Sequence, residues 1–165
     1  MRHGIRIGVD VGSVRVGVAV CDPDGVLATP LRTLRRAGDE SDIQEIAHLA
    51  ADSAAIEVVV GLPLSLDGAE RAAAEVARGW SKALRRRAPG LAVRLVDERM
   101  TTVDAHRAMQ ASGLHERDRR DVIDQQAAVL ILQAALDAER ISGQPAGELV
   151  GGRKPRHSHR ADTER

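Results

Sequence analysis

The stretch IRIGVDVGSVRVGVAVC, residues 5–21, decides the fold. Its two halves, residues 5–10 and 14–21, are rich in Val and Ile and are separated by glycine and serine, which is typical of two strands joined by a tight turn. A third run rich in Val, Leu and Thr follows at residues 26–34. The chain is therefore predicted to open with an antiparallel meander of three strands.

Helices and strands alternate in the rest of the chain. Apolar side chains recur at helical spacing, whereas the runs at 56–60 and 92–96 are short and mostly apolar, which is typical of buried parallel strands. The predicted helices span residues 41–52, 69–87, roughly 102–112 and roughly 121–140. This order predicts an α/β fold with a mixed five-stranded sheet, antiparallel meander plus parallel strands, and helices on both faces.

The length of 165 residues fits one domain with a real hydrophobic core. After Ile141 the apolar periodicity is lost, and Gly, Pro, Arg and His accumulate. Such a composition cannot bury enough apolar surface to fold by itself. Residues 1–141 are predicted to form the domain, and residues 142–165 a disordered, mildly basic tail.

Charge and cysteine content limit the partners and the compartment. Lys plus Arg and Asp plus Glu both total 24, so any attraction to nucleic acid must be local. The single cysteine, Cys21, excludes an intramolecular disulfide and suits a reducing compartment. The longest apolar run, residues 127–132, is far below the roughly 18 residues of a membrane span. We expect a cytoplasmic protein with no membrane partner.

Two candidate site residues stand at the ends of predicted strands. Asp10 ends the first strand beside a turn, where ligands gather in α/β sheets, although it could equally initiate that turn by accepting bonds from backbone amides. Glu98 follows the fifth strand, next to Asp97. Because side chains alternate along a strand, Asp97 and Glu98 point to opposite faces, and only one of them can share a site with Asp10.

Asp124 is the most informative acidic residue. It is predicted to lie one turn into the last helix, on the face of Ala128, Ile131 and Ala135 that must pack on the sheet. A carboxylate on an apolar face needs protein donors, a cation or a proton. The alternative is that helix N-terminal amides satisfy it, with Asp121 as the N-cap.

Asp10, Glu98 and Asp124 can converge if the first and fourth strands are adjacent and the last helix packs beside them. Such a shell of carboxylate oxygens is what Mg²⁺ or Mn²⁺ prefers. Two ions of this kind could orient a water molecule and stabilise the leaving oxygen of a phosphodiester displacement. The three acids are therefore candidate catalytic residues that act as metal ligands.

Basic residues near these acids are candidates for binding the phosphate backbone. Arg99 could hold a phosphate through its planar fork or pair with Asp97 at the surface. Arg119 and Arg120 precede the helix that carries Asp124, and we prefer them as backbone contacts. Thr101 is a further candidate for substrate contact, although the Ser/Thr-x-x-Asp pattern that it begins is typical of a helix cap.

Four blocks in this order and spacing carry a family resemblance: DVGSVRVGVAVCD, VVVGLPLSLDG, VDERMTT and VIDQQAAVLILQ. Over about residues 5–138 the chain resembles the YqgF or RuvX-like family of bacterial proteins with an RNase H-like fold. The resemblance implies a fold similar to the RuvC Holliday junction resolvase and a role in maturing the 5′ end of pre-16S ribosomal RNA, hence in ribosome biogenesis. It also places the family's acidic site on Asp10, Glu98 and Asp124.

Two departures from the family pattern are visible. The family often has Ser where Cys21 stands, which should be harmless. It often has Lys shortly before the final helix, where this chain has Arg119, Arg120 and Asp121. Phosphate contact in that loop is therefore expected to differ.

The leading hypothesis is a hydrolase that cleaves phosphodiester bonds in structured precursor rRNA, with a Holliday junction resolvase acting on branched DNA as the alternative. A resolvase cuts two symmetric strands and should be a two-fold dimer, whereas a monomer can trim RNA. An ATP-binding protein of the actin type would need a second, similar domain, and 165 residues are too few for two such domains. A non-catalytic nucleic-acid-binding module is disfavoured, because carboxylates repel a phosphate backbone unless a cation intervenes.

Overall fold

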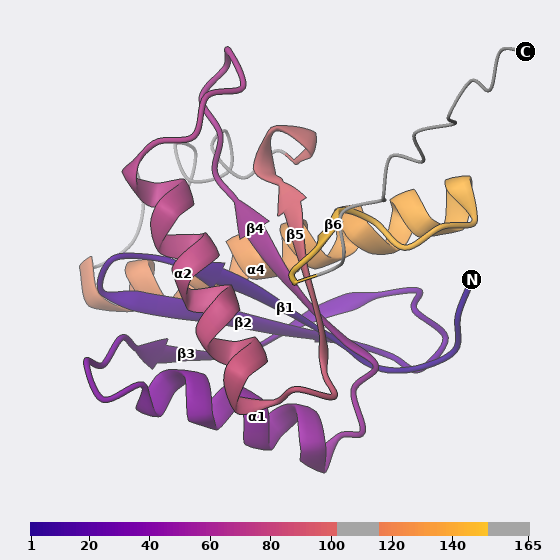
Figure 1. Ribbon diagram of the computed structural model, residues 1–165, viewed down its shortest axis with the longest axis horizontal. Coiled ribbons are helices and arrows are strands. Elements are labelled where there is room, and N and C mark those ends of the chain that lie inside the picture. The colour runs from indigo at the N-terminus through magenta and orange to yellow at the C-terminus, as the bar shows by residue number, and fades with distance from the viewer. Residues whose placement is uncertain (102–115, 152–165) are drawn as a thin grey trace, which may run out of the picture.

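The computed structural model describes residues 1–101 and 116–151, without the side chains of residues 116–119. Within these residues the chain forms one mixed sheet of six strands in the order β3-β2-β1-β4-β5-β6 (Figure 1). The strands are β1 (Arg6–Val11), β2 (Arg15–Cys21), β3 (Ala28–Arg35), β4 (Glu57–Leu62), β5 (Ala92–Asp97) and β6 (Glu148–Leu149). The helices are α1 (Ser41–Asp52), α2 (Ala72–Arg87), the 3-10 turn η1 (Glu98–Met100) and α4 (Glu116–Ser142).

β1 lies at the centre of the strand pairing. It pairs antiparallel with β2, where Asp10 faces Gly17, and parallel with β4, where Val9 faces Val60. The expected adjacency of the first and fourth strands is therefore confirmed. The carboxyl ends of β1, β4 and β5 meet at one edge of the sheet, which is where ligands bind in α/β folds.

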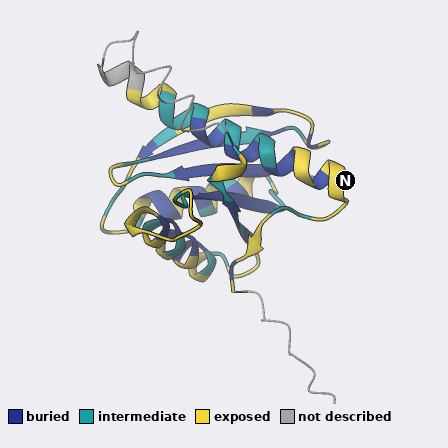
Figure 2. Ribbon diagram, turned by 90° about the horizontal axis from the view of Figure 1, so that it is seen from above, coloured by how far each residue is buried: buried dark blue, intermediate teal, exposed yellow. Residues whose placement is uncertain are grey.

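Two hydrophobic cores cover the two faces of the sheet, as the mixed α/β prediction requires. Val58 and Val60 point to the core beneath α1 and α2, whereas Val59 points to the core beneath α4. This alternation within one continuous apolar run is the consequence of the two-residue period of a strand. Figure 2 shows the buried sheet between helices whose outer sides are exposed.

The last helix starts earlier than the sequence pattern predicts. α4 begins at Glu116, not near Asp121, and runs to Ser142. The early turns were missed because residues 116–120 (ERDRR) are charged throughout and carry no apolar period. The helix predicted over 102–112 lies outside the described residues.

The beginning of the predicted tail belongs to the fold, which corrects the expected disorder from residue 142. Glu148 and Leu149 form β6, which pairs antiparallel with β5 and gives the sheet its sixth strand. Val150 is buried, its backbone N–H donates to the carbonyl of Val93 over 2.8 Å, and the guanidinium of Arg85 donates to its carbonyl. Two paired residues are too few for a periodic signal. The division of the chain into a domain and a tail stays a prediction.

A buried ionic network closes the sheet edge where β1 and β4 begin. Arg6, Glu57 and Glu139 are all nearly inaccessible to solvent. The Arg6 guanidinium contacts Glu139 at 3.1 Å, and Arg2 bridges Glu139 at 2.7 Å and Glu57 at 3.0 Å. Arg94 from β5 completes the network with a 3.1 Å contact to Glu57.

Cys21 is buried, as expected of a small hydrophobic residue, and this burial raises the pKa of its thiol. In the part of the chain that is described, no helix is long and apolar enough to cross a membrane.

Candidate active site

A cavity of about 510 Å³ opens at the carboxyl end of β1. It is lined by the turn between β1 and β2, by Pro63 after β4, and by the first residues of α2. Asp10, Glu98 and Asp124 also line it, and they come from β1, η1 and α4. The three acids that the sequence singled out are therefore brought to one cavity, although they are far apart along the chain.

Asp10 is the most buried of the three, with 5% of its surface exposed. It lies directly opposite Gly17 in the β1–β2 ladder. Gly8, two residues earlier on the same face, lies under α4: a Cβ there would come within 2.6 Å of the Leu132 Cβ. The Asp10 side chain therefore shares the α4 face of the sheet.

Gly17 brings α4 close to Asp10. A Cβ at this position would overlap the carbonyl oxygen of Asp124, so only glycine allows the helix backbone to rest on β2 here. Because Gly17 and Asp10 are cross-strand partners, the same close approach brings Asp124 to the cavity.

Two features bring Glu98 to the cavity: the alternation of side chains along β5 and the absence of a side chain at Gly61 in β4. Val96 packs in the core beneath α4, so Glu98, two residues later, is expected on the same side. A Cβ on Gly61 in β4 would lie 2.7 Å from the Glu98 Oε1 atom, which shows that the Glu98 side chain lies over that glycine.

Asp97 has a separate role and does not line the cavity that holds Asp10 and Glu98. Its carboxylate accepts a 2.9 Å bond from the backbone N–H of Arg99 and caps η1. It also pairs with the Arg99 guanidinium at 2.6 Å. Hydrogen bonding from the Arg99 side chain lowers the pKa of Asp97.

Asp124 is not stabilised by the start of its helix. Because α4 begins at Glu116, Asp124 lies beyond the first turns, where free backbone amides are found, and Asp121 is not the N-cap. Its face is the one expected, since Ala128 and Ile131 are fully buried. The side chain itself is 20% exposed and accepts a 2.9 Å bond from the Arg15 Nε atom.

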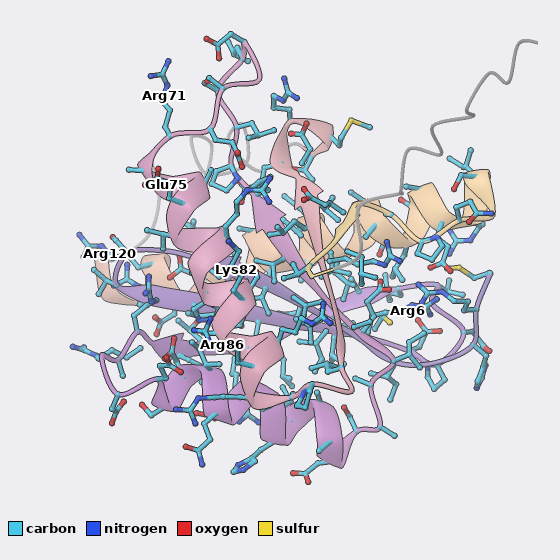
Figure 3. The ribbon with its side chains drawn as sticks, viewed as in Figure 1. Arg6, Arg71, Glu75, Lys82, Arg86 and Arg120 are labelled. Carbon is cyan, nitrogen blue, oxygen red and sulfur yellow. The ribbon has the colours of Figure 1, made fainter. Side chains whose placement is uncertain are left out.

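Among the described residues, the candidate phosphate contacts Arg99, Thr101 and Arg120 do not line the acid cavity. Arg99 is held by Asp97, which is one of the two interpretations left open by the sequence. The Thr101 hydroxyl donates to the Glu98 carbonyl over 2.6 Å and closes η1, whereas a helix start after it lies outside the described residues. Arg120 is exposed at the end of the molecule where α4 begins, as is Arg71 where α2 begins (Figure 3). The side chain of Arg119 lies outside the description.

Arg15 is the cavity residue that the sequence reasoning missed. It stands two residues before Gly17, so the two-residue period of β2 places both on the α4 face. The same alternation that separates Asp97 from Glu98 could have found it. Within the described residues, no three Asp, Glu, His or Cys side chains are gathered closely enough to form a ready metal site.

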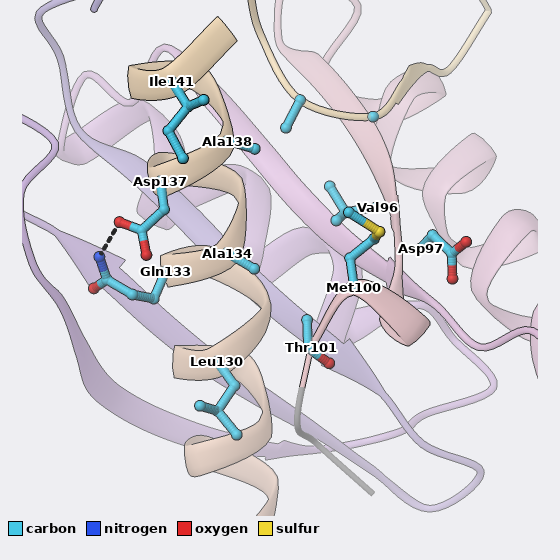
Figure 4. Close-up of a pocket in the computed structure, with 12 residues that line it drawn as sticks. Val96, Asp97, Met100, Thr101, Leu130, Gln133, Ala134, Asp137, Ala138 and Ile141 are labelled. Atoms are coloured by element: carbon cyan, nitrogen blue, oxygen red, sulfur yellow. Dashed lines mark hydrogen bonds between the residues drawn. The ribbon is translucent and has the colours of Figure 1, made fainter.

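A second cavity, of about 550 Å³, lies between α4, the end of β5 and the segment before β6 (Figure 4). Its walls are largely apolar, with Val96, Leu130 and Ile141 among them. Asp137 at its rim is bonded to Gln133 at 3.0 Å. None of the three candidate acids lines this cavity, so we place the chemistry in the smaller one.

Comparison with known proteins gives consistent matches. A family model described as "RuvX: Holliday junction resolvase" matches residues 4–138. A Kineococcus radiotolerans protein is 54% identical over 161 residues, which cover 97% of this chain and 85% of the relative. A Streptomyces coelicolor protein is 51% identical over 150 residues, covering 91% and 90%. Both relatives are provisionally named as pre-16S rRNA nucleases.

Among solved structures, Thermus thermophilus RuvC in complex with a Holliday junction substrate matches with a TM-score of 0.55. The match covers 86% of this chain and 98% of that chain, at 13% sequence identity. At this identity the likeness concerns the fold alone, and the fold is the mixed α/β arrangement of RuvC.

Proposed function

The chain belongs to the RuvX family of Holliday junction resolvases, and on that premise we propose that it is a metal-dependent nuclease whose ligands are Asp10, Glu98 and Asp124. The family resemblance and the RNase H-like fold expected from the sequence are confirmed. As a member of this family, the protein is a hydrolase that acts on phosphodiester bonds. The observation that carries the proposed site is the convergence of three carboxylates from three elements on one cavity.

The donor set in the cavity fits a hard divalent cation. Among the described residues that line it, the acidic side chains are carboxylates and none is His or Cys, which favours Mg²⁺ or Mn²⁺ over zinc or copper. When bound, such an ion supplies charge stabilisation to a phosphodiester and activates a water molecule. Asp10 would hold it from the buried strand β1, Glu98 from η1 and Asp124 from α4.

The remaining walls orient the substrate and limit access of water. The β1–β2 turn and the start of α2 line the cavity, so they are proposed to border the bound phosphodiester. Arg119 and Arg120, at the start of α4, are proposed to contact the flanking backbone. Arg99 and Thr101 are weaker candidates. Arg99 would first have to break its ion pair with Asp97, and the Thr101 hydroxyl donates to the backbone carbonyl of Glu98.

We infer that the substrate is structured precursor rRNA, near the 5′ end of the 16S sequence. The support is the shared provisional name of relatives that match this chain over nine-tenths of its length. Such a nuclease would act in the cytoplasm, where ribosomes are assembled. A branched DNA junction is the second candidate, supported by the description of the family model. A monomer suits the first substrate, and a two-fold dimer suits the second.

One experiment separates the two substrates. The purified protein is incubated in parallel with end-labelled precursor rRNA and with a four-way DNA junction, in Mg²⁺ or Mn²⁺ and in EDTA, and Asp10→Asn serves as the inactive control. We expect metal-dependent cleavage of the rRNA at a defined position, absent in EDTA and in Asp10→Asn. Symmetric cutting of the junction without rRNA cleavage would replace the first substrate by the second. No cleavage of either would refute the nuclease proposal.

A further inference from the structure

Arg15 forms an ion pair inside the acid cavity. Its Nε atom donates to the Oδ2 atom of Asp124 over 2.9 Å. Both residues line the cavity together with Asp10 and Glu98. The two side chains are 29% and 20% exposed, so the pair is neither fully solvated nor sealed in the core.

The backbone fixes Arg15 in this position. The Gly12 N–H donates to the Arg15 carbonyl over 2.8 Å, which closes the turn from β1 into β2. Two residues later, Gly17 rests against the backbone of Asp124. The contact that brings Asp124 to the cavity therefore also brings it within reach of Arg15.

The negative charges in the acid cavity favour a cation beside them. Three carboxylates that line one cavity repel each other, and a cation placed between them reduces this repulsion. The Arg15 guanidinium compensates one of the three negative charges. A divalent cation that binds the same Asp124 oxygen competes with this guanidinium, because two positive charges close to one oxygen repel each other.

We propose that Arg15 is a built-in counter-ion of Asp124, which the metal displaces, and that the released guanidinium then binds a phosphate of the substrate. The inference rests on the proposed metal-dependent nuclease and adds a residue to it. The planar fork of arginine matches a phosphate as well as it matches a carboxylate, so the exchange leaves each charged group with a partner.

The first test measures Mn²⁺ binding by calorimetry, without nucleic acid, and the melting temperature with and without Mn²⁺. Arg15→Gln removes the charge and keeps most of the stem, and Arg15→Lys keeps the charge. The matched control is Arg32→Gln, which breaks a 2.8 Å surface pair with Glu45 away from the cavity.

We expect Arg15→Gln to bind Mn²⁺ about three- to tenfold more tightly than the wild type, because the competing cation is gone. Its melting temperature should fall without metal and recover at saturating Mn²⁺. Arg15→Lys should bind Mn²⁺ with nearly wild-type affinity, and Arg32→Gln should leave it unchanged. A merely structural Arg15 would instead lower the melting temperature equally in both conditions.

Unchanged or weaker Mn²⁺ affinity in Arg15→Gln overturns the inference, and so does an absence of Mn²⁺ binding in both proteins. Because this assay needs no cleavage, a wild type that binds Mn²⁺ but cuts nothing would refute the nuclease proposal alone. Conversely, normal wild-type cleavage with Mn²⁺ affinity unaffected in Arg15→Gln refutes only the role of Arg15.

The second test asks whether the released Arg15 guanidinium binds a phosphate of the substrate. Fluorescence anisotropy measures binding of a labelled RNA hairpin with and without Mn²⁺, and the RNA is checked for integrity after each titration. Mn²⁺ should strengthen binding to the wild type at least several-fold more than to Arg15→Gln. Equal strengthening in both proteins would overturn the phosphate step.

Discussion

Gly17 in β2 and Asp124 in α4 are in direct backbone contact, with no room for a side chain between them. Gly17 is also the cross-strand partner of Asp10. One glycine therefore determines how closely the helix that carries one acid approaches the strand that carries another.

Gly17→Ala should abolish cleavage and lower the melting temperature. The added methyl group overlaps the Asp124 carbonyl, which is backbone and cannot swing aside, so α4 must shift away from β2. We expect a loss of roughly 1–3 kcal/mol in the free energy of unfolding, as for an overpacked core. Urea denaturation and the rRNA cleavage assay measure both effects.

Gly79→Ala is the matched control for this substitution. Gly79 lies in α2, and a Cβ built there meets nothing within 4 Å. Because alanine favours a helix, this variant should gain about 0.5–1 kcal/mol and cut normally. A Gly17→Ala protein as stable and active as Gly79→Ala would show that α4 does not need the close approach.

Glu139→Gln should destabilise the protein and alter its response to acid. The side-chain hydrogen bond from Arg2, with the nearby charge of Arg6, lowers the pKa of Glu139 to about 2. A lowered pKa means that the ionised carboxylate stabilises the fold above its usual pKa of 4.5, and that this stability is lost as the pH falls toward 2. Loss of the charge leaves Arg6 buried without its anion, at a cost of roughly 3–5 kcal/mol.

The check is urea denaturation of the wild type and Glu139→Gln from pH 7 to pH 3. The wild type should lose stability as the pH falls below 4.5, whereas the variant should depend less on pH in that window. Parallel pH profiles for the two proteins would mean that other groups dominate the acid response. Because the network lies at the edge of the sheet where β1 and β4 begin, the folded variant should retain cleavage at neutral pH.

Arg120→Gln should weaken binding of nucleic acid and reduce its salt dependence. If Arg120 contacts one phosphate, its removal should make the slope of log affinity against log salt shallower by about 0.7–0.9. Anisotropy titrations at several salt concentrations measure this slope, and Arg32→Gln, on the side of α1, is the control for a lost surface charge. An unchanged slope in Arg120→Gln would remove this residue from the interface.

The period-two rule explains how much of the site the sequence could predict. It predicted that only one of Asp97 and Glu98 shares a site with Asp10, and Glu98 alone lines the cavity of Asp10, while the helical period placed Asp124 on the buried face of Ala128 and Ile131. It could also have placed Arg15 beside Gly17. The contact between Arg15 and Asp124, however, depends on how closely α4 approaches β2, and a local pattern does not contain that distance.

The first turns of α4 and the strand β6 were not predicted, for a different reason. The first turns of α4 are charged on every side, so they have no apolar stripe, and their helical state reflects continuation of the packed part of the helix. β6 has only two paired residues, and it forms because the edge of β5 offers unpaired backbone groups. In both cases the cause lies in the tertiary structure.

The most direct test of the central claim compares the wild type with Asp124→Asn for melting temperature and cleavage, each with and without Mg²⁺. As a metal ligand, Asp124 is essential for cleavage, and its replacement relieves repulsion among three carboxylates while it breaks a partly exposed pair with Arg15. The account predicts a protein that melts close to the wild type without Mg²⁺, gains little stability from Mg²⁺, and does not cut. An Asp124→Asn protein that is clearly destabilised yet still cuts with Mg²⁺ would contradict the three-carboxylate site.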